Sequence, residues 1–96
     1  MNGMTYRTFT MPMAQVRTAT LAALHRMGVT VSSREKTPEG EVIKARASER
    51  DIEIDLDAVT PNTTRMRTVV RNGLFMDSAT GTEIILQTEK ILNAQA

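Results

Sequence analysis

Three carboxylates recur at two-residue spacing in the middle of the chain, at Glu53, Asp55 and Asp57. Alternate residues of a strand point to the same face of a sheet, so this spacing places the three side chains together. Paired carboxylates serve general acid–base catalysis or metal binding where their charge is not already matched. The neighbouring predicted strands carry Lys and Arg, which keep carboxylates ionised. We therefore predict neither a catalytic nor a metal-binding role for these three residues.

The chain contains one histidine, His25, and no cysteine. His25 falls near the end of a predicted helix and off its apolar side, where a surface position suits the helix dipole. The lack of cysteine excludes disulfides, thiolate metal ligands and a cysteine nucleophile. Arg71, Asn72 and Gly73 lack the glycine spacing and the lysine of a phosphate-binding loop. We therefore predict that the protein is not an enzyme and uses no cofactor.

The composition is typical of one folded domain. Of the 96 residues, 41% are hydrophobic and 24% are charged, as in chains that fold around a single core. We expect residues 1–96 to form one domain. The formal net charge is +1, so no long-range field draws the chain to nucleic acid or to an anionic membrane.

A first helix is predicted to begin at Pro12, because proline suits the first turn, where its missing N–H is not needed. Apolar and small residues then recur at spacings of three and four, which predicts one buried helix face. These residues are Val16, Ala19, Thr20, Ala23, Leu24 and Met27. Gly28 follows directly and is expected to end the helix in the left-handed conformation.

The stretch Val70–Asp77 predicts the end of a strand, a turn and the start of a last helix. Gly73 is expected to turn the chain, Phe75 to anchor the turn in the core, and Asp77 to cap the helix. The buried side of this helix is expected at Ile84, Thr88 and Ile91, with Ile85 and Leu92 flanking it. Gly81 lies within the helix, where glycine costs up to about 1 kcal/mol relative to alanine. A close approach to the sheet or to the first helix would explain it.

Strands are predicted before the first helix, from about Thr5 to Met11, and between the two helices. The clearest alternation sets Ile52, Ile54, Leu56 and Ala58 against Glu53, Asp55 and Asp57. Turns at Thr37–Gly40, Ser48–Asp51 and Thr60–Asn62 separate four strands, and short turns join antiparallel strands. The predicted fold is therefore an α+β two-layer sandwich in the order strand, helix, four strands, helix. Its sheet is mainly antiparallel, and both helices cover one face.

The sheet face without helices is predicted to carry a basic, an acidic and a basic strip on three adjacent strands. The candidate binding residues on it are Lys44, Arg46, Glu53, Asp55, Asp57, Arg65 and Arg67. The expected pairs between the first two strands are Ala45–Ile54, Arg46–Glu53 and Lys44–Asp55. Those between the next two are Leu56–Met66, Asp57–Arg65 and Asp55–Arg67. Such a face is either a solvated surface whose charges neutralise one another or an interaction surface.

The order of the predicted elements is also that of the TATA-binding-protein-like fold, whose open sheet face can hold DNA. A sheet that binds nucleic acid needs cations for the phosphates and aromatic or apolar groups for the bases. The central strand presents three carboxylates instead, and no aromatic residue is expected on the face. We therefore predict that the protein does not bind nucleic acid.

A series of short motifs and single residues is spaced along the chain. In order, they are Asn2-Gly3, Thr5-Tyr6, Pro12-Met13, Val16, Ala19, Leu24, Gly28, Val31, Gly40, Ile43, Ala45 and Val70–Asp77. In order and spacing they resemble domain-of-unknown-function family 3568, a group of small bacterial cell-envelope proteins, often lipoproteins. Asn72 and Met76 depart from the family's pattern, which has an apolar residue and a second glycine there. The resemblance implies a periplasmic or outer-membrane-associated protein and supplies no catalytic residues. We expect the chain to be the mature folded part of a longer exported protein.

These observations predict a non-enzymatic envelope module that binds a protein or associates with itself. An edge strand or the open sheet face would make the contact. Membrane contact is expected only through a lipid anchor upstream of this chain. The alternative is a small-ligand-binding domain with a pocket between the sheet and the helices, near Phe9, Met13 and Phe75.

Overall fold

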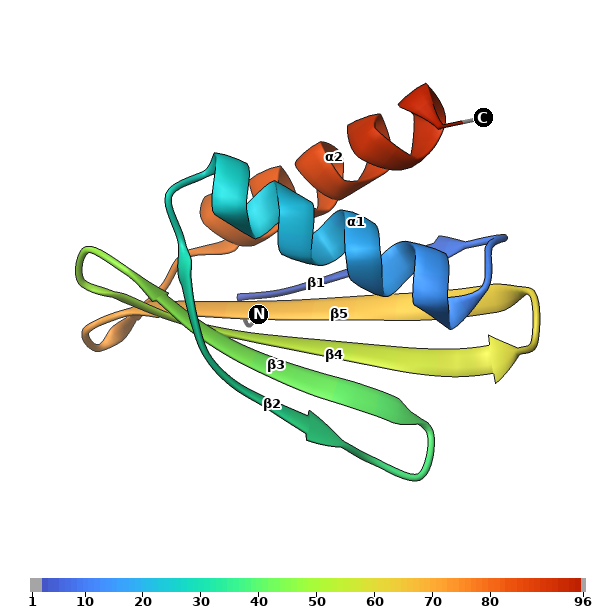
Figure 1. Cartoon of the computed structure of the whole chain (residues 1–96). Coiled ribbons are helices and arrows are strands. Elements are labelled where there is room, and N and C mark those ends of the chain that lie inside the picture. The colour runs from blue at the N-terminus through green and yellow to red at the C-terminus, as the bar shows by residue number, and fades with distance from the viewer. Residues whose placement is uncertain (1–2, 96) are drawn as a thin grey trace.

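Two helices lie across one face of a single antiparallel sheet (Figure 1). The structure is a computed structural model that describes residues 3–95. Its elements are β1 (Met4–Phe9), α1 (Met13–Arg26), β2 (Thr30–Lys36), β3 (Gly40–Ala47), β4 (Arg50–Thr60), β5 (Thr63–Asn72), β6 (Phe75–Met76) and α2 (Ser78–Ala94). The predicted α+β sandwich and its order of elements are confirmed, with the two-residue strand β6 as an unpredicted addition.

The strand order in the sheet is β1-β5-β4-β3-β2, and β6 also pairs with β5. Strands β2 to β5 form the predicted meander, since each is antiparallel to the next. The N-terminal strand β1 pairs with the far end of this meander, from Met4 opposite Val69 to Phe9 opposite Thr64. Strand β6 pairs with β5 at Arg71 and Asn72. β1 and β6 therefore follow each other along the same side of β5.

The predicted register between β3 and β4 is wrong by two residues. Ala45 faces Ile52 rather than Ile54, because the turn holds only Ser48 and Glu49 and the next residue, Arg50, is already paired. Ser48 has φ +53°, a left-handed conformation that a two-residue hairpin turn requires. A shift of two keeps every side chain on its predicted face.

The predicted register between β4 and β5 is confirmed. As predicted, Leu56 faces Met66, Asp57 faces Arg65, and Asp55 faces Arg67. The turn here uses Pro61 and Asn62, between the last paired residues of the two strands. Proline and asparagine both favour such a turn, which is why the sequence located it correctly.

The core lies between the helices and the inner sheet face. Five of the six residues predicted for the buried face of α1 are buried, and Met27 is partly buried. In α2 the three residues predicted for the buried side are buried, and so are the two predicted to flank it, Ile85 and Leu92. Two of these positions are threonines, Thr20 and Thr88, whose hydroxyls each donate a 2.8 Å hydrogen bond to the carbonyl four residues earlier. Both buried hydroxyls are therefore paired within their own helix.

A buried carboxylate joins the two layers at one edge of the sheet. Glu41, on the inner face of β3, is only 4% exposed. It accepts a 2.6 Å hydrogen bond from Arg34 of β2 and a 2.7 Å hydrogen bond from Arg17 of α1. The hydrogen bond from Arg34 outweighs the opposing effect of burial, and with Arg17 it keeps the pKa of Glu41 below its ordinary value. Glu41 thus stays ionised and bridges helix and sheet.

The start of α2 follows the prediction for Asp77. Its carboxylate accepts a 3.0 Å hydrogen bond from the Thr80 backbone N–H and a 2.6 Å hydrogen bond from Arg50 Nε. These interactions, that with Arg50 first, lower the pKa of Asp77 to about 2. Gly28 has φ +74°, so its predicted left-handed conformation is confirmed. Gly73 turns the chain as predicted, with φ +62°.

Gly81 marks the point where α2 comes closest to the sheet. A Cβ atom at this position would lie 3.0 Å from Thr5 Oγ1 and 3.6 Å from Thr68 Cγ2. The contact with Thr68 would be an ordinary van der Waals contact, but the Thr5 hydroxyl would have to give way by a few tenths of an ångström. The predicted close approach is confirmed, and it is to the sheet.

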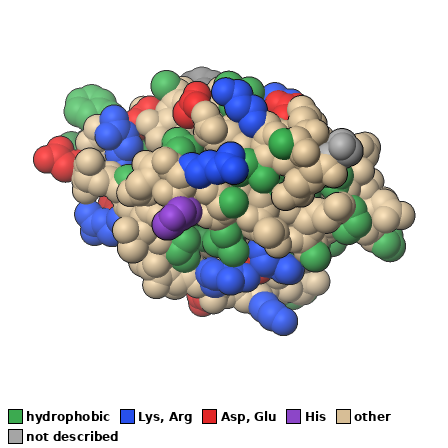
Figure 2. Space-filling view, turned by 45° about the horizontal axis from the view of Figure 1, so that its top comes forward, with side chains coloured by type: hydrophobic (Ala, Val, Ile, Leu, Met, Phe, Trp, Pro, Cys, Tyr) green, Lys and Arg blue, Asp and Glu red, His purple; other side chains and the backbone are tan. Residues whose placement is uncertain are grey.

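The helix-covered side shows hydrophobic, basic and acidic side chains interspersed with one another (Figure 2). His25, the histidine drawn in purple, is exposed there, as predicted. Of the helices in residues 3–95, none combines the length and the apolar character that crossing a bilayer requires.

Candidate functional site

The sheet face away from the helices, which we call the open face, is organised in rows. Paired residues on neighbouring strands point to the same side of a sheet, so the register aligns their side chains across it. One row consists of Lys44, Glu53, Val69 and Met4, on β3, β4, β5 and β1. The next consists of Arg46, Asp51, Arg71 and Met76, on β3, β4, β5 and β6.

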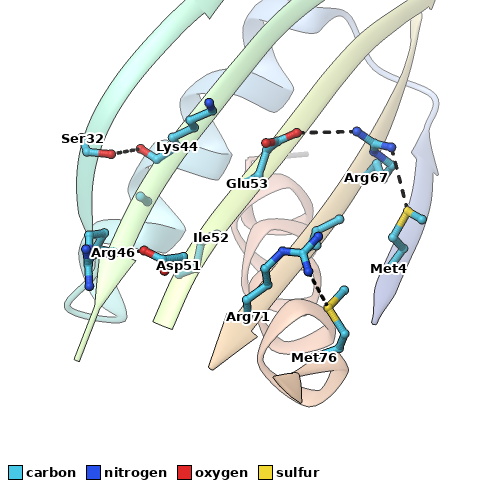
Figure 3. Close-up of a pocket in the computed structure, with 12 residues that line it drawn as sticks. Met4, Ser32, Lys44, Arg46, Asp51, Ile52, Glu53, Arg67, Arg71 and Met76 are labelled. Carbon is cyan, nitrogen blue, oxygen red and sulfur yellow. Dashed lines mark hydrogen bonds and ion pairs between the residues drawn. The ribbon is translucent and has the colours of Figure 1, made fainter. Parts of the chain in front are cut away.

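These two rows line a hollow of about 710 Å³, which we call the large hollow. Ser32, Ala45, Ile52 and Arg67 complete its lining. Figure 3 shows Lys44 and Arg46 on one side of it, Arg71 and Met76 on the other, and Glu53 between the two sides. Its volume is within the range of ligand-binding pockets.

Arg67 interacts with two carboxylates of β4, and this leaves another cation of the large hollow without a carboxylate. Its guanidinium bonds to Asp55 and also lies 3.6 Å from Glu53. Glu53 therefore leans toward β5, away from Lys44, its cross-strand neighbour on β3 (Figure 3). Within residues 3–95, Lys44 has no carboxylate at ion-pair distance.

The second row has one carboxylate for two arginines. Asp51 lies 3.4 Å from Arg46, with both side chains more than 60% exposed, and an ion pair of that kind is worth at most about 1 kcal/mol. Arg71 instead donates to the sulfur of Met76 at 3.4 Å. A thioether sulfur is a weak acceptor, so the charge of Arg71 remains available.

A second, smaller hollow of about 370 Å³ lies at the other end of the open face. It is lined by Tyr6, Thr37, Glu39, Val42, Asp55, Asp57, Arg65 and Arg67. Three of these residues are acidic and two are basic, whereas the large hollow has four basic and two acidic residues. The open face is therefore positive around the large hollow and negative around the small one.

Tyr6 corrects the prediction that the open face lacks an aromatic residue. It lies on β1 opposite Arg67 and is 56% exposed. Burial disfavours the Arg67 cation, but its interactions with Asp55 and Tyr6 outweigh this and raise the pKa of Arg67 above its ordinary value. Asp55 Oδ1 is buried without a partner among residues 3–95. The centre of the face is thus a partly buried ion pair beside an exposed aromatic ring.

All seven candidate residues predicted for the open face lie on it, but not all pair as expected. Asp57 and Arg65 are 3.2 Å apart and Asp55 bonds to Arg67, both as predicted. The predicted pairs Arg46–Glu53 and Lys44–Asp55 do not form, since Arg46 faces Asp51 and Lys44 faces Glu53. The cause is the two-residue turn after β3, which moves the register by two.

Eight of the twelve residues that line the large hollow are not among the predicted candidates: Met4, Ser32, Ala45, Asp51, Ile52, Val69, Arg71 and Met76. Asp51 was assigned to a turn, and Met4 and Met76 lie outside the predicted strands. Arg71 could have been found, because it continues the alternation of Arg65 and Arg67 along β5.

Beside the large hollow, the end of the β5–β6 turn and the strand β6 itself expose three consecutive apolar side chains. Leu74 is 98% exposed, Phe75 77% and Met76 37%. We call these three residues the apolar tip. The prediction that Phe75 anchors the turn in the core is wrong, because this turn projects beyond the end of both helices (Figure 1).

The predicted pocket between sheet and helices is not assembled from its expected residues. Phe9 is buried beside Thr64 at the start of β5, whereas Phe75 pairs with Asn72 at the opposite end of that strand. Met13 packs instead against Gly40: its methyl group lies 2.6 Å from the point where a Cβ of residue 40 would be, next to the Leu56 carbonyl. Phe75 therefore cannot share a pocket with Phe9, and both hollows described above lie on the open face.

Four carboxylates of the open face pair with arginines, which favours their ionised form and disfavours acid–base chemistry. Asp51, Glu53, Asp55 and Asp57 each lie within 3.6 Å of an arginine nitrogen. Across residues 3–95, no three acidic or histidine side chains converge as a metal site would need. The chemistry that this face offers is recognition through charge and apolar contact.

Comparison with known proteins supplies a family. A search of curated proteins gave no match to the chain. The profile of the family described as "Protein of unknown function (DUF3568)" matches residues 1–90. This match covers β1 through most of α2 and includes both hollows and the apolar tip. The chain belongs to this family of proteins of unknown function.

Proposed function

We propose that the protein is a non-enzymatic module of the bacterial cell envelope that binds another protein through its open face. The observation that carries the proposal is the large hollow beside the apolar tip. Leu74 is 98% exposed and Phe75 77%, and contiguous exposed apolar side chains mark interaction sites on soluble proteins.

The composition of this region supports protein recognition. Aromatic residues, methionine and arginine are enriched at protein interfaces, and this end of the open face offers Phe75, Met4, Met76, Arg46 and Arg71. Methionine side chains adapt to different partner shapes. A hollow beside a projecting tip also gives a partner two features to match at once.

The open face is a better binding surface than the edge strand β2. A β-bulge at Ser32 interrupts its pairing with β3, and its exposed end carries Arg34, Glu35 and Lys36. Bulges and charged residues are the features with which natural sheets prevent another strand from adding to an edge. This favours the open face over the free side of β2 as the place of contact.

Two further parts of the proposal have separate support. The non-enzymatic role is supported by the arginines that hold the carboxylates of the open face in ion pairs, since such pairing disfavours protonation. The envelope location is supported only by the resemblance of the motifs to small bacterial envelope proteins.

Site-specific photo-cross-linking in the bacterium that carries the protein tests the proposal. A photoreactive phenylalanine analogue replaces Leu74 in one variant and Val59 in another. Val59 is a matched control, because it is apolar and 56% exposed but lies at the other end of β4. We expect a discrete cross-linked protein from position 74 and none from position 59.

The captured protein is then purified and its affinity measured. We expect the double substitution L74S/F75S to weaken binding at least about 30-fold, because truncating two exposed interface anchors removes hot-spot contacts worth roughly 2 kcal/mol or more. A cross-linked product of twice the mass of the chain would identify the partner as a second copy. Equal cross-linking from both positions, or unchanged affinity of L74S/F75S, would refute the proposal.

A further inference from the structure

We infer that the large hollow receives an acidic segment of the partner protein, with carboxylates placed between Lys44 on β3 and Arg71 on β5. The inference rests on the proposed function, because it names the partner's chemistry at the same face. Its basis is charge complementarity: among the lining cations, Arg46 and Arg67 pair with carboxylates, whereas Lys44 and Arg71 have no carboxylate at ion-pair distance within residues 3–95.

Lys44 and Arg71 are the cations best placed to bind such a segment. Arg67 is already bonded to Asp55 and lies near Glu53. Glu53, the cross-strand neighbour of Lys44, lies near Arg67 instead. Among residues 3–95, the hydrogen-bond partner of the Arg71 side chain is the sulfur of Met76, a weak acceptor. Carboxylates from outside could therefore form charge-assisted hydrogen bonds without breaking an ion pair of the chain.

The shape and charge of the hollow favour a narrow segment over a flat anionic surface. Glu53 and Asp51 lie between the two cations, in the middle strand of the hollow (Figure 3). A membrane of anionic lipids would meet these carboxylates together with the cations. A side chain that enters the hollow can instead approach Lys44 or Arg71 and leave the carboxylates to one side.

The lining also specifies what should accompany the acidic residue. Met4, Val69 and Met76 give the β1–β5–β6 side of the hollow an apolar surface. An apolar side chain next to the acidic one could cover that surface while its neighbour binds a cation. The expected segment therefore combines acidic with apolar residues.

Selection from a random peptide library displayed on phage tests the inference. The chain is immobilised as wild type, as K44E/R71E and as the control R26E/K90E. Both double variants change the net charge equally, and Arg26 and Lys90 are exposed residues of the two helices, away from the open face. We expect peptides enriched in Asp or Glu beside apolar residues from wild type and from the control. K44E/R71E should bind the selected peptides at least about tenfold more weakly, because like charges then face each other.

Each outcome decides the question. Peptides without acidic enrichment, or acidic peptides bound equally well by K44E/R71E, would overturn the inference. If binding of the selected peptides still required Leu74 and Phe75, the proposed function would stand even though this inference failed. The wild-type protein could also sediment with phosphatidylglycerol vesicles while K44E/R71E does not, and the library could yield no peptide. These two results together would assign the cations to a lipid surface and overturn the inference. Selected acidic peptides that also compete with the partner captured through position 74 would support both proposals.

Discussion

Arg17 of α1 donates a 2.7 Å hydrogen bond to the carboxylate of Glu41, whose side chain on the inner face of β3 is only 5% exposed. Arg34 of β2 occupies the other carboxylate oxygen at 2.6 Å. One acid thus connects the first helix with two strands at the edge of the sheet. Hydrogen bonds of this charged kind are shorter and stronger than neutral ones.

Replacing Glu41 by alanine should lower the free energy of unfolding by about 2–3 kcal/mol. Hydrogen bonds to charged groups contribute about 1.5–3 kcal/mol each, but the two arginines are about one third to one half exposed and can be rehydrated. Urea unfolding followed by circular dichroism measures the change. The control E35A alters an exposed acid of β2 and should stay within about 0.5 kcal/mol of wild type. Equal stability of E41A and E35A would contradict this role of Glu41.

The Asp77 cap should make stability depend on pH in the acid range. Its pKa is about 2 in the folded protein against an ordinary value of 3.8. Between these values the unfolded chain binds a proton that the folded chain does not, so the free energy of unfolding falls as the pH falls from 3.8 toward 2. The contribution is fully present above about pH 5.

The substitution D77N should remove this pH-dependent term while it keeps a capping oxygen. We expect wild type to exceed D77N by about 1 kcal/mol at pH 7, and the difference to shrink toward zero near pH 2. Urea unfolding of both proteins at several pH values gives the difference directly, so that other titrating acids cancel. A difference that stays constant between pH 7 and pH 2 would show that the charge of Asp77 does not stabilise the fold.

Gly40 is required for space, whereas Gly28 is required for its backbone conformation. A Cβ at Gly40 would lie 1.9 Å from the Leu56 carbonyl oxygen, but one at Gly28 would meet nothing within 4 Å. We expect G40A to cost at least about 2–3 kcal/mol, since backbone atoms must move, and G28A about 1 kcal/mol. G28N should recover part of that loss because asparagine tolerates the left-handed conformation. A G40A protein as stable as G28A would refute the steric explanation.

The apolar tip should be dispensable for stability. We expect L74S and F75S each to change the free energy of unfolding by less than about 0.5 kcal/mol, because both side chains are mostly exposed. F9A should cost about 3–5 kcal/mol, since Phe9 is buried. Thermal and urea unfolding compare the three variants. A loss of more than 1 kcal/mol in F75S would mean that Phe75 supports the core after all.

Much of the fold could be predicted because its signals are local. Alternation and turn residues located the strands, Pro12 and Asp77 located the helix starts, and Gly28 located a helix end. The register of β3 and β4 could not be predicted, because Ser48 takes a left-handed conformation that its residue type does not favour. The addition of β1 beside β5 depends on tertiary contact and has no sequence signal.

The candidate face was predicted more accurately than the details of its hollows. Two-residue periodicity assigned the charged side chains to one side whatever the register. Which cation keeps a partner depends on the register and on the reach of Arg67, neither of which periodicity specifies. The burial of Glu41 was missed for a related reason: its two arginines lie on separate elements, one of them the helix α1.

The position of β1 in the sheet has a consequence for the order in which the chain folds. Thr5 Oγ1 lies within hydrogen-bonding distance of the Thr68 carbonyl, 63 residues further along the chain, whereas β2 to β5 pair with their sequence neighbours. Contacts of long sequence separation form later, because more chain entropy must be lost to close them. We therefore expect the central meander to assemble first and the N-terminal strand to be the last part of the sheet to join, so that one side of β5 is paired only when β1 arrives.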